Sequence, residues 1–347
     1  MQSAILHKPV FICGLRKSGT SMVRLLFDGH PQLYVAPPNE MKFFHYTTIP
    51  AMESYKETTF DSAEAIKEHL LDDIMINVLG SGDTNFHRDS FDLDGFKRTM
   101  RAKRHADLKE LITDMMRAFA QHSQSFTGDV DTTRFVWKGE MQTEYFLEKR
   151  AMFPDLKCIY VLRNPYGHFN AVRNSYRTDS KRARGQVIFD NSLSWRERYP
   201  FLINHIMYMK TSYTLMDKFA TLFPESFRIM IYDDLLRDPE KEMRSVCGFL
   251  DIPFHEALLT PTLLGEPWGG NSMVQDREFK GIDKKPLDHW KKSITKNEIR
   301  LINTHFSWVF EKYGFERIES NASIYKPFHY TEFFKRYVAN RVAFFLR

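Results

Sequence analysis

The sequence predicts an α/β fold built around a parallel β-sheet, and two observations carry that prediction. Three short runs of apolar residues lack polar alternation: Pro9–Gly14, Leu156–Leu162 and Phe227–Tyr232. Such runs are typical of strands that are covered on both faces of a parallel sheet. Segments with helical periodicity lie between and after these runs, so strands and helices alternate along the chain.

The other elements follow from local signals. A weaker strand is predicted at Thr133–Trp137, and helices are predicted at Thr20–Asp28, Glu144–Phe153, Trp195–Phe223 and Pro239–Leu250. Asp238 precedes the last of these helices as an N-cap residue, with a proline at the first helical position. Thr295 and Glu298 have the spacing of a capping box, which predicts a helix running to about Tyr313.

Two regions depart from this alternation. Residues 46–124 carry helical patterns and polar loops without a clear strand, so we expect a helical insertion within one domain over residues 1–324. In residues 325–347, aromatic and aliphatic side chains recur near helical spacing with basic residues between them. This pattern favours a C-terminal helix docked on the body or on a second subunit, and the alternative is a helix on a membrane surface.

The composition excludes several classes of protein. The chain has 347 residues, of which 43% are hydrophobic and 27% charged, the balance of an ordinary globular protein and not of a disordered chain. A net charge of +5 is too small to predict nucleic-acid binding. Three widely spaced cysteines (Cys13, Cys158, Cys247) suggest neither a disulfide framework nor a zinc site. With no signal-peptide pattern and no run of roughly 18 apolar residues, we expect a cytoplasmic protein.

The most informative segment is the Gly14–Ser21 turn, which joins the first strand to the first helix. A helix N-terminus presents unpaired N–H groups to an anion, and Gly19 allows the backbone to approach a phosphate closely. Ser18, Thr20 and Ser21 contribute hydroxyl groups, and Lys17 contributes a positive charge. These residues predict a phosphate-binding turn.

The turn is not a standard nucleotide triphosphatase loop. Gly14 and Gly19 have the separation found in the G-x-x-x-x-G-K-[ST] pattern, but Thr20 follows the second glycine and the lysine precedes it. A kinase-like phosphotransferase that uses this turn therefore stays only as an alternative. A second alternative is a non-catalytic module that binds adenine nucleotides or an anionic surface.

Arg16–Ser21 resembles the 5′-phosphosulfate loop of the sulfotransferases that use 3′-phosphoadenylyl sulfate (PAPS). The strand that ends in Arg163-Asn-Pro is similar to the 3′-phosphate site of that family, and Ile229–Leu250 resembles its later strand, turn and helix. These segments occur in the family's order between Val10 and Phe315. The resemblance implies a P-loop-like three-layer fold with a central parallel sheet flanked by helices. It also implies PAPS as sulfuryl donor, 3′-phosphoadenosine 5′-phosphate (PAP) as product, and an acceptor hydroxyl.

The resemblance also implies a set of donor-binding residues. The family's serine eight positions after the arginine is replaced by Ala171 in this chain, so Asn170, Arg173 or Ser175 is expected to take its place. Lys280 and Gly281 match the segment that closes over the 3′-phosphate. The predicted donor-binding set is Arg16, Lys17, Ser18, Gly19, Thr20, Ser21, Arg163, Asn170, Ser175, Lys280 and Gly281.

Sulfuryl transfer requires charge stabilisation on the departing phosphate and a base for the acceptor proton. Lys17 is the candidate for the first role. Glu40 and the Phe43-Phe44 pair match the Glu-x-x-Phe-Phe segment of glycan sulfotransferases, in which the glutamate is the proposed base. His45 is the competing base, since a histidine titrates near neutral pH. No cluster with metal-ligand spacing occurs, and we expect no metal.

Lys138 matches the lysine of a Lys-Thr-Pro segment in many family members, although Gly139 and Glu140 replace the other two residues. It is expected either to contact the acceptor or sulfate or to be a solvated lysine at a strand end. The acceptor is expected to be a glycan because of the segment at Glu40, while a lipid or a small natural product stays open.

Overall fold

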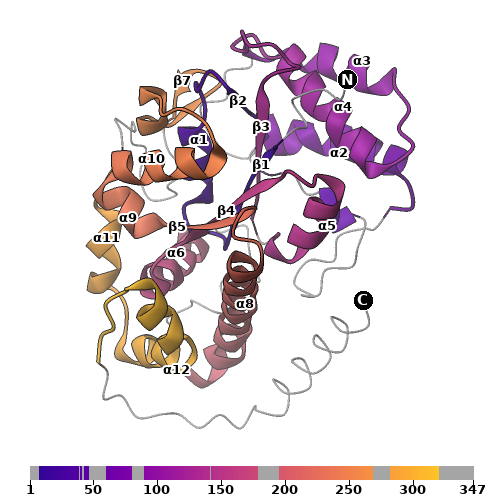
Figure 1. Ribbon diagram of the computed structural model, residues 1–347. Coiled ribbons are helices and arrows are strands. Elements are labelled where there is room, and N and C mark those ends of the chain that lie inside the picture. The colour runs from indigo at the N-terminus through magenta and orange to yellow at the C-terminus, as the bar shows by residue number, and fades with distance from the viewer. Residues whose placement is uncertain are drawn as a thin grey trace. The chain divides into compact units, whose positions relative to one another are not determined.

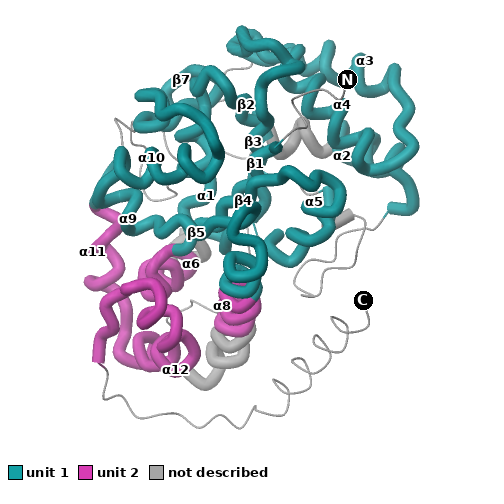
Figure 2. Tube along the Cα trace, viewed as in Figure 1, with its two compact units in different colours: residues 1–48, 58–162, 215–284 teal, residues 49–57, 163–214, 285–347 magenta. Residues whose placement is uncertain are grey.

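The computed structural model describes most of the chain, in several stretches: residues 8–38, 40, 43–46, 60–79, 90–140, 142–178, 195–268 and 282–319. The predicted C-terminal helix over 325–347 lies outside them. The chain forms two compact units, each drawn in its own colour in Figure 2. Unit 1 comprises residues 1–48, 58–162 and 215–284, and unit 2 comprises residues 49–57, 163–214 and 285–347.

Unit 1 is built on a five-stranded parallel sheet with the strand order β2-β3-β1-β4-β5 (Figure 1). Its strands are β1 (Val10–Gly14), β2 (Leu33–Val35), β3 (Arg134–Glu140), β4 (Lys157–Leu162) and β5 (Phe227–Ile231). The three strands predicted from continuous apolar runs are confirmed as β1, β4 and β5. The weaker strand is longer than predicted, and β2 was not predicted because three residues are too few for a periodic pattern.

The central position of β1 explains its composition. Val10 pairs with Val136 on one side and with Lys157 on the other, and the register continues to Gly14, which lies between Glu140 and Val161. All five residues of β1 are buried. A strand that is covered on both faces must be apolar throughout, which is why this run lacks polar alternation.

The two faces of the sheet are covered by different helices. Side chains alternate between faces along a strand, so Trp137 and Lys138 point in opposite directions. Lys138 contacts Ser21 on α1 (Thr20–Leu26), while the Trp137 ring packs against Phe153, which directly follows α5 (Phe146–Met152). Unit 1 therefore has helix, sheet and helix layers, as the predicted fold class requires.

The C-terminal part of unit 1 packs against the end of α1. The Asp28 carboxylate accepts hydrogen bonds from the Thr262 hydroxyl (2.7 Å) and from the Gly265 N–H (2.9 Å). These two residues belong to a small antiparallel hairpin. The elements of this part are α9 (Tyr232–Arg237), α10 (Pro239–Leu250), a 3-10 turn (Glu256–Leu259), β6 (Thr262–Leu263) and β7 (Glu266–Pro267).

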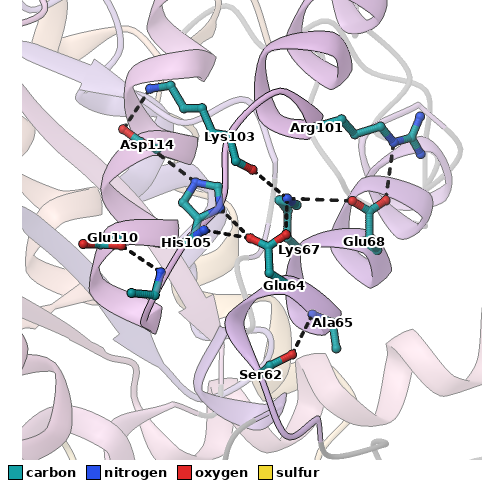
Figure 3. Close-up of polar contacts among 11 residues, drawn as sticks. Ser62, Glu64, Ala65, Lys67, Glu68, Arg101, Lys103, His105, Glu110 and Asp114 are labelled. Atoms are coloured by element: carbon teal, nitrogen blue, oxygen red, sulfur yellow. Dashed lines mark hydrogen bonds and ion pairs between the residues drawn. The ribbon is translucent and has the colours of Figure 1, made fainter.

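The described part of the predicted insertion is helical. It contains α2 (Ala63–Leu79), α3 (Leu93–Arg101) and α4 (Leu108–Gln121). Figure 3 shows the polar contacts between them: the buried Lys67 ammonium donates to Glu64 (2.6 Å) and to the carbonyl of Lys103 (2.9 Å). Glu64 also accepts from the backbone N–H of His105. The Lys67 hydrogen bond lowers the pKa of Glu64 to about 2, so the two side chains form an ion pair within α2. Their hydrogen bonds to Lys103 and His105 connect α2 to the segment between α3 and α4.

The regular elements that the structure describes in unit 2 are all helices or helical turns. Its elements are α6 (Pro165–Thr178), the first part of α8 (Trp195–Leu222), α11 (Pro286–His289), a 3-10 turn (Trp290–Lys292) and α12 (Lys296–Tyr313). The predicted capping box at Thr295 and Glu298 is confirmed, with both of its hydrogen bonds present. In the part of the chain that the structure describes, no helix is long and apolar enough to cross a membrane.

Candidate active site

The Gly14–Ser21 turn begins where β1 leaves the sheet. Three of its residues have positive φ angles: Gly14 (149°), Lys17 (66°) and Gly19 (105°). The backbone N–H of Ser18 donates to the carbonyl of Leu15 at 3.0 Å and closes the turn. Lys17 is the one non-glycine residue of the turn in this conformation, which places its side chain on a tightly curved backbone.

Glycine is required at positions 14 and 19 for two reasons: the positive φ angle of the backbone and the lack of space for a side chain. A Cβ on Gly19 would overlap the ring of Tyr232, which begins α9. A Cβ on Gly14 would lie 2.8 Å from the carbonyl oxygen of Val161 and 2.9 Å from the Ser18 hydroxyl. The Tyr232 ring therefore packs directly against Gly19 of the turn, a contact that was not predicted from the sequence.

The hydroxyl groups of the turn differ in their partners. Ser21 accepts a hydrogen bond from Lys138 (3.1 Å), and Thr20 donates a long one to Glu140 (3.5 Å). The Ser18 hydroxyl is buried and has no hydrogen-bond partner among the described residues. An unsatisfied buried hydroxyl costs about 1–3 kcal/mol, and a phosphate oxygen bound in the turn would satisfy it. The turn therefore fits a phosphate group.

Lys138 lies between the turn and two carboxylates. Its side chain is fully buried, which excludes the alternative of a solvated lysine at a strand end. Its Nζ atom lies 3.1 Å from the Ser21 hydroxyl, 3.0 Å from Glu140 and 3.8 Å from Glu40. Lys138 and Glu140 share one face of β3 because they are two residues apart in a strand. The ammonium group thus joins the candidate base to the phosphate-binding turn.

Glu140 is ionised in this environment. Burial alone would raise the pKa of its carboxyl, but the Lys138 ammonium outweighs burial and holds the pKa below its usual value. The Arg16 guanidinium acts in the same direction. Glu140 was not among the predicted site residues. A carboxylate at a strand end carries no distinctive signal in the sequence, and its role arises from the neighbours that the fold supplies.

Arg24 holds the segment that leads to Glu40. It lies on α1 and is almost fully buried, and its guanidinium donates to the carbonyls of Ala36 and Pro38, both at 2.7 Å. A third, longer contact reaches Pro37 (3.4 Å). Arg24 was not among the predicted site residues, and its sequence signal is an arginine on the apolar face of a short helix.

The residues around the predicted base are placed only in part. The Glu40 side chain is 27% exposed, so it reaches both Lys138 and solvent. Phe43 and Phe44 are buried in the core, and Phe44 stacks on Tyr145 at a centroid distance of 6.1 Å. His45 belongs to a 3-10 turn, Phe43–Tyr46, but its side chain lies outside what the structure describes.

Of the predicted 3′-phosphate residues, Arg163, Asn170 and Ser175 belong to unit 2, while Lys280 and Gly281 belong to unit 1. Arg163 follows β4, and its Nε atom would lie 3.4 Å from a Cβ on Gly167, while a ring carbon of Trp290 would lie at 3.1 Å. Glycine at position 167 thus makes room for both side chains. Trp290 in turn packs on Tyr166 with a centroid distance of 5.1 Å.

Two of the three candidate replacements for the family's serine belong to one buried network. Arg173 donates to both carboxylate oxygens of Glu298 (2.7 and 2.8 Å) and to Asn170 Oδ1 (2.6 Å). Asn170 Oδ1 also accepts from the Ser293 hydroxyl at 2.5 Å. These bonds orient the Asn170 amide with its oxygen towards Arg173 and Ser293. The side chain of Ser175 and residues 280–281 lie outside what the structure describes.

Asp28 and His30, at the end of the first helix, serve the fold. Asp28 anchors the β6–β7 hairpin, as described above. The ring of His30 is buried with Nε2 at 3.0 Å from the carbonyl of Pro253, and burial lowers the pKa of this imidazole. Within the described ranges, no group of three or more histidine, cysteine, aspartate or glutamate side chains is arranged to hold a metal ion.

In a comparison with known proteins, the chain matches the profile of a protein family. The profile of a family described as "Sulfotransferase family" matches residues 9–256. A relative in Aquifex aeolicus (strain VF5), described as an uncharacterized protein, is 21% identical over 290 residues, which is 82% of this chain. The chain spans only 30% of the length of that relative.

Solved structures with a similar fold include two bacterial domains. The sulfotransferase domain from the curacin biosynthetic pathway matches with a TM-score of 0.50 and 18% identity, covering 87% of this chain and 98% of that domain. The sulfotransferase domain of the Synechococcus PCC 7002 olefin synthase has a TM-score of 0.47 and 20% identity, covering 83% and 90%. At such low identity, the likeness concerns the fold alone.

Proposed function

Because the chain belongs to the sulfotransferase family, we propose that it transfers a sulfuryl group from PAPS to an acceptor hydroxyl. The observation that supports this most is the arrangement around Lys138. Its buried ammonium joins a phosphate-fitting turn, through Ser21, to a partly exposed carboxylate, Glu40. A transferase needs these two parts side by side, one for the leaving group and one for the acceptor.

The turn would hold the 5′ end of the donor. PAPS, when bound, supplies an activated sulfuryl group on a phosphate that departs with negative charge. The Ser18 hydroxyl and the backbone N–H groups of the turn donate to phosphate oxygens, and the Lys17 ammonium stabilises the charge that builds up there. We assign the 3′-phosphate to Arg163 and Asn170, with Lys280 as a further contact.

The transfer step follows from the position of Glu40. The acceptor oxygen forms a bond to sulfur as the bond from sulfur to the bridging phosphate oxygen breaks, and the electron pair of that bond stays on the phosphate. The acceptor proton passes to a carboxylate oxygen of Glu40. Arg24 fixes the Ala36–Pro38 backbone ahead of Glu40, so the carboxylate is held in place before the acceptor binds.

We propose a glycan as the acceptor. The support is the likeness of the Glu40-to-Phe44 segment to glycan sulfotransferases. Because Phe43 and Phe44 are buried in the core, they hold this segment in place and do not line an open apolar groove. A screen of glycan, lipid and small-molecule fractions with sulfur-35-labelled PAPS tests the assignment. Labelling of a lipid or small-molecule fraction in place of glycans would overturn it.

Three variants test the assigned roles. Lys17→Ala should lower turnover by about 10²–10³-fold, as does the loss of a preorganised donor to a developing anion. It should also weaken PAP binding, because the lysine meets the phosphate in the ground state as well. Glu40→Gln should lower turnover by about 10²–10⁴-fold and leave PAP affinity nearly unchanged. Turnover is measured with labelled PAPS and the acceptor fraction from the screen, and affinity by isothermal titration with PAP.

His45→Asn serves as the matched control for the base. Turnover near the wild-type rate in Glu40→Gln, together with an inactive His45→Asn, would transfer the role of base to the histidine. If both variants stay active, neither residue removes the proton. Lys17→Ala with full turnover would contradict the role assigned to Lys17. A wild-type protein that binds PAP but transfers label to no fraction would favour a non-catalytic nucleotide-binding module.

A further inference from the structure

Glu140 is a second carboxylate close to the proposed base, Glu40. The carboxylates of Glu140 and Glu40 are both within ion-pair distance of the Lys138 ammonium group. The two carboxylates come from different elements, since Glu140 ends β3 and Glu40 follows β2 in the chain. Thr20, at the start of α1, donates its hydroxyl to Glu140 at 3.5 Å.

The distances around Lys138 are unequal. Its Nζ atom is within hydrogen-bond range of Glu140 (3.0 Å) and of Ser21 (3.1 Å), but it lies 3.8 Å from Glu40. At 3.8 Å an ammonium and a carboxylate attract one another without a hydrogen bond of normal length. Glu140 and Ser21 therefore take the hydrogen bonds of the ammonium, and Lys138 acts on Glu40 by electrostatic attraction. The carboxyl groups of Glu40 and Glu140 are also hydrogen-bonded to one another.

Because Lys138 is fully buried, its ammonium group requires a charged partner. An ammonium group without exposed surface must be paired, because a buried charge without a partner is costly. Glu140 is the side chain that pairs with it most closely. If Glu140 lost its charge, the remaining carboxylate within ion-pair distance would be Glu40, among the residues that the structure describes.

We propose that Glu140 is a positioning residue for sulfuryl transfer, which keeps the Lys138 ammonium beside Ser21 and so prevents it from closing onto Glu40. The proposal rests on the proposed role of Glu40 as proton acceptor. A carboxylate that is fully paired with a buried ammonium is a weak base, whereas one that faces a second carboxylate is a stronger one.

Three cations act on this pair or on the segment that carries Glu40. Lys138 lies between the two carboxylates, and the Arg16 guanidinium in the turn acts on Glu140. Arg24 on α1 binds the carbonyl of Pro38, two residues ahead of Glu40. Glutamine keeps the length of the side chain and all three cations are retained in the sequence, so the substitution removes one negative charge and frees Lys138 to move towards Glu40.

The test is an NMR titration that needs no acceptor. The protein is labelled with carbon-13 at the glutamate carboxyl carbons, and the Glu40 resonance is identified by its loss in Glu40→Gln. In Glu140→Gln we expect this resonance to titrate about one pH unit lower than in the wild type, because a neighbouring negative charge is gone and Lys138 closes onto Glu40. Glu140→Asp keeps the charge and should restore most of the wild-type value.

The pH dependence of turnover gives the second readout. With labelled PAPS and the acceptor fraction from the screen, the acidic limb of the Glu140→Gln profile should move down by about one unit, and the plateau should fall about tenfold. Glu256→Gln, at an exposed site on the same unit, is the control and should change neither readout.

The outcomes separate the two proposals. If the Glu40 resonance titrates alike in the wild type and Glu140→Gln, the positioning role is wrong, whatever the activity shows. If the resonance shifts while Glu40→Gln keeps full turnover, the coupling is real and the assignment of Glu40 as base is wrong. If Glu140→Gln fails to fold, the titration of Glu140→Asp decides. This variant keeps the negative charge, so a fall of about one pH unit in the titration of the Glu40 resonance would contradict the argument from charge.

Discussion

The Lys149 ammonium is enclosed by aromatic rings on the face of the sheet opposite to α1. Its Nζ atom lies 4.3 Å from the ring centre of Phe11, 4.5 Å from that of Phe44 and 5.3 Å from that of Tyr145. A hydrogen bond of 3.3 Å runs to the carbonyl of Gln142. Burial lowers the pKa of Lys149 to about 7, and the aromatic rings offset part of that penalty by cation–π attraction.

This pKa predicts how stability varies with pH. The pKa is about 7 in the folded state and 10.5 for a free lysine, so between these values the unfolded chain binds more protons than the folded one. The free energy of unfolding therefore rises with pH across this window, by up to about 1.4 kcal/mol per unit from this group. Lys149→Met should lack that rise. Urea unfolding at pH 7.5, 8.5 and 9.5 measures the difference between the two proteins.

Lys218→Met, at an exposed position on α8, is the matched control and should follow the wild type at each pH. Parallel curves for the wild type and Lys149→Met would show that the buried amine does not change its protonation on unfolding.

At the scale of the elements, α6 and α12 are joined by one buried ion pair. Glu298 accepts from Arg173 with both carboxylate oxygens, and it also accepts from the backbone N–H of Thr295 at 2.8 Å. The same carboxylate therefore ends the capping box of α12 and anchors α6. Each partner has only 6% of its side chain exposed.

Removing one partner of the Arg173–Glu298 ion pair should lower the free energy of unfolding far more than removing the N-cap side chain of Thr295. We expect Arg173→Ala to lower the free energy of unfolding by about 3–5 kcal/mol, because it leaves the Glu298 carboxylate buried and unpaired. Thr295→Ala should cost about 1 kcal/mol, the usual value for an N-cap. Denaturant unfolding compares both variants. Arg244→Ala removes an exposed pair with Glu240 on α10 and should cost less than about 1 kcal/mol. Equal losses in all three would refute the argument.

Strands were predictable from the sequence where nearly every residue of the strand is buried. Val10–Gly14 and Lys157–Leu162 are apolar along their length because helices cover both faces of the sheet, and this pattern is visible without a structure. The capping box at Thr295 is a local signal of the same kind. By contrast, β2 has only three residues, and its place at the edge of the sheet depends on pairing with β3.

The site was predictable for the turn and less so for the groups that surround it. Lys17 and Gly19 follow from a pattern over a few consecutive residues. Arg24 and Glu140 are ordinary charged residues in the sequence, and they gain their roles from carbonyls and an ammonium that distant segments bring to them. Tyr232 supports Gly19 from more than two hundred residues away. Such pairings depend on the tertiary fold, which local patterns do not contain.

At the scale of the whole molecule, the chain interleaves two units. It leaves unit 1 after Leu162 and returns within α8 at Leu215, so the sheet of unit 1 is made from segments on both sides of a unit 2 segment. The Gly14–Ser21 turn belongs to unit 1. A ligand of the turn therefore stabilises the unit that contains the sheet, and its effect should be visible in global unfolding.

We expect PAP to raise the unfolding temperature, and at a free concentration of a hundred times its dissociation constant it should add about 2.7 kcal/mol to the free energy of unfolding. Differential scanning calorimetry with increasing PAP measures this rise. Lys17→Ala should show a smaller rise at equal PAP concentration, since it binds the ligand less tightly. No rise in the wild type, with a titration that still reports binding, would mean that PAP binds the folded and unfolded chains equally.

The strand order has a consequence for biosynthesis. β5 pairs with β4, but the segment of unit 2 is translated between them. A ribosome therefore releases β1 to β4 while the outer edge of β4 still lacks its neighbour, and that strand reads KCIYVL. An apolar, unpaired edge is a template for association between chains. The time needed to translate residues 163–226 is thus the period in which the nascent polypeptide is most open to aggregation and most in need of chaperones.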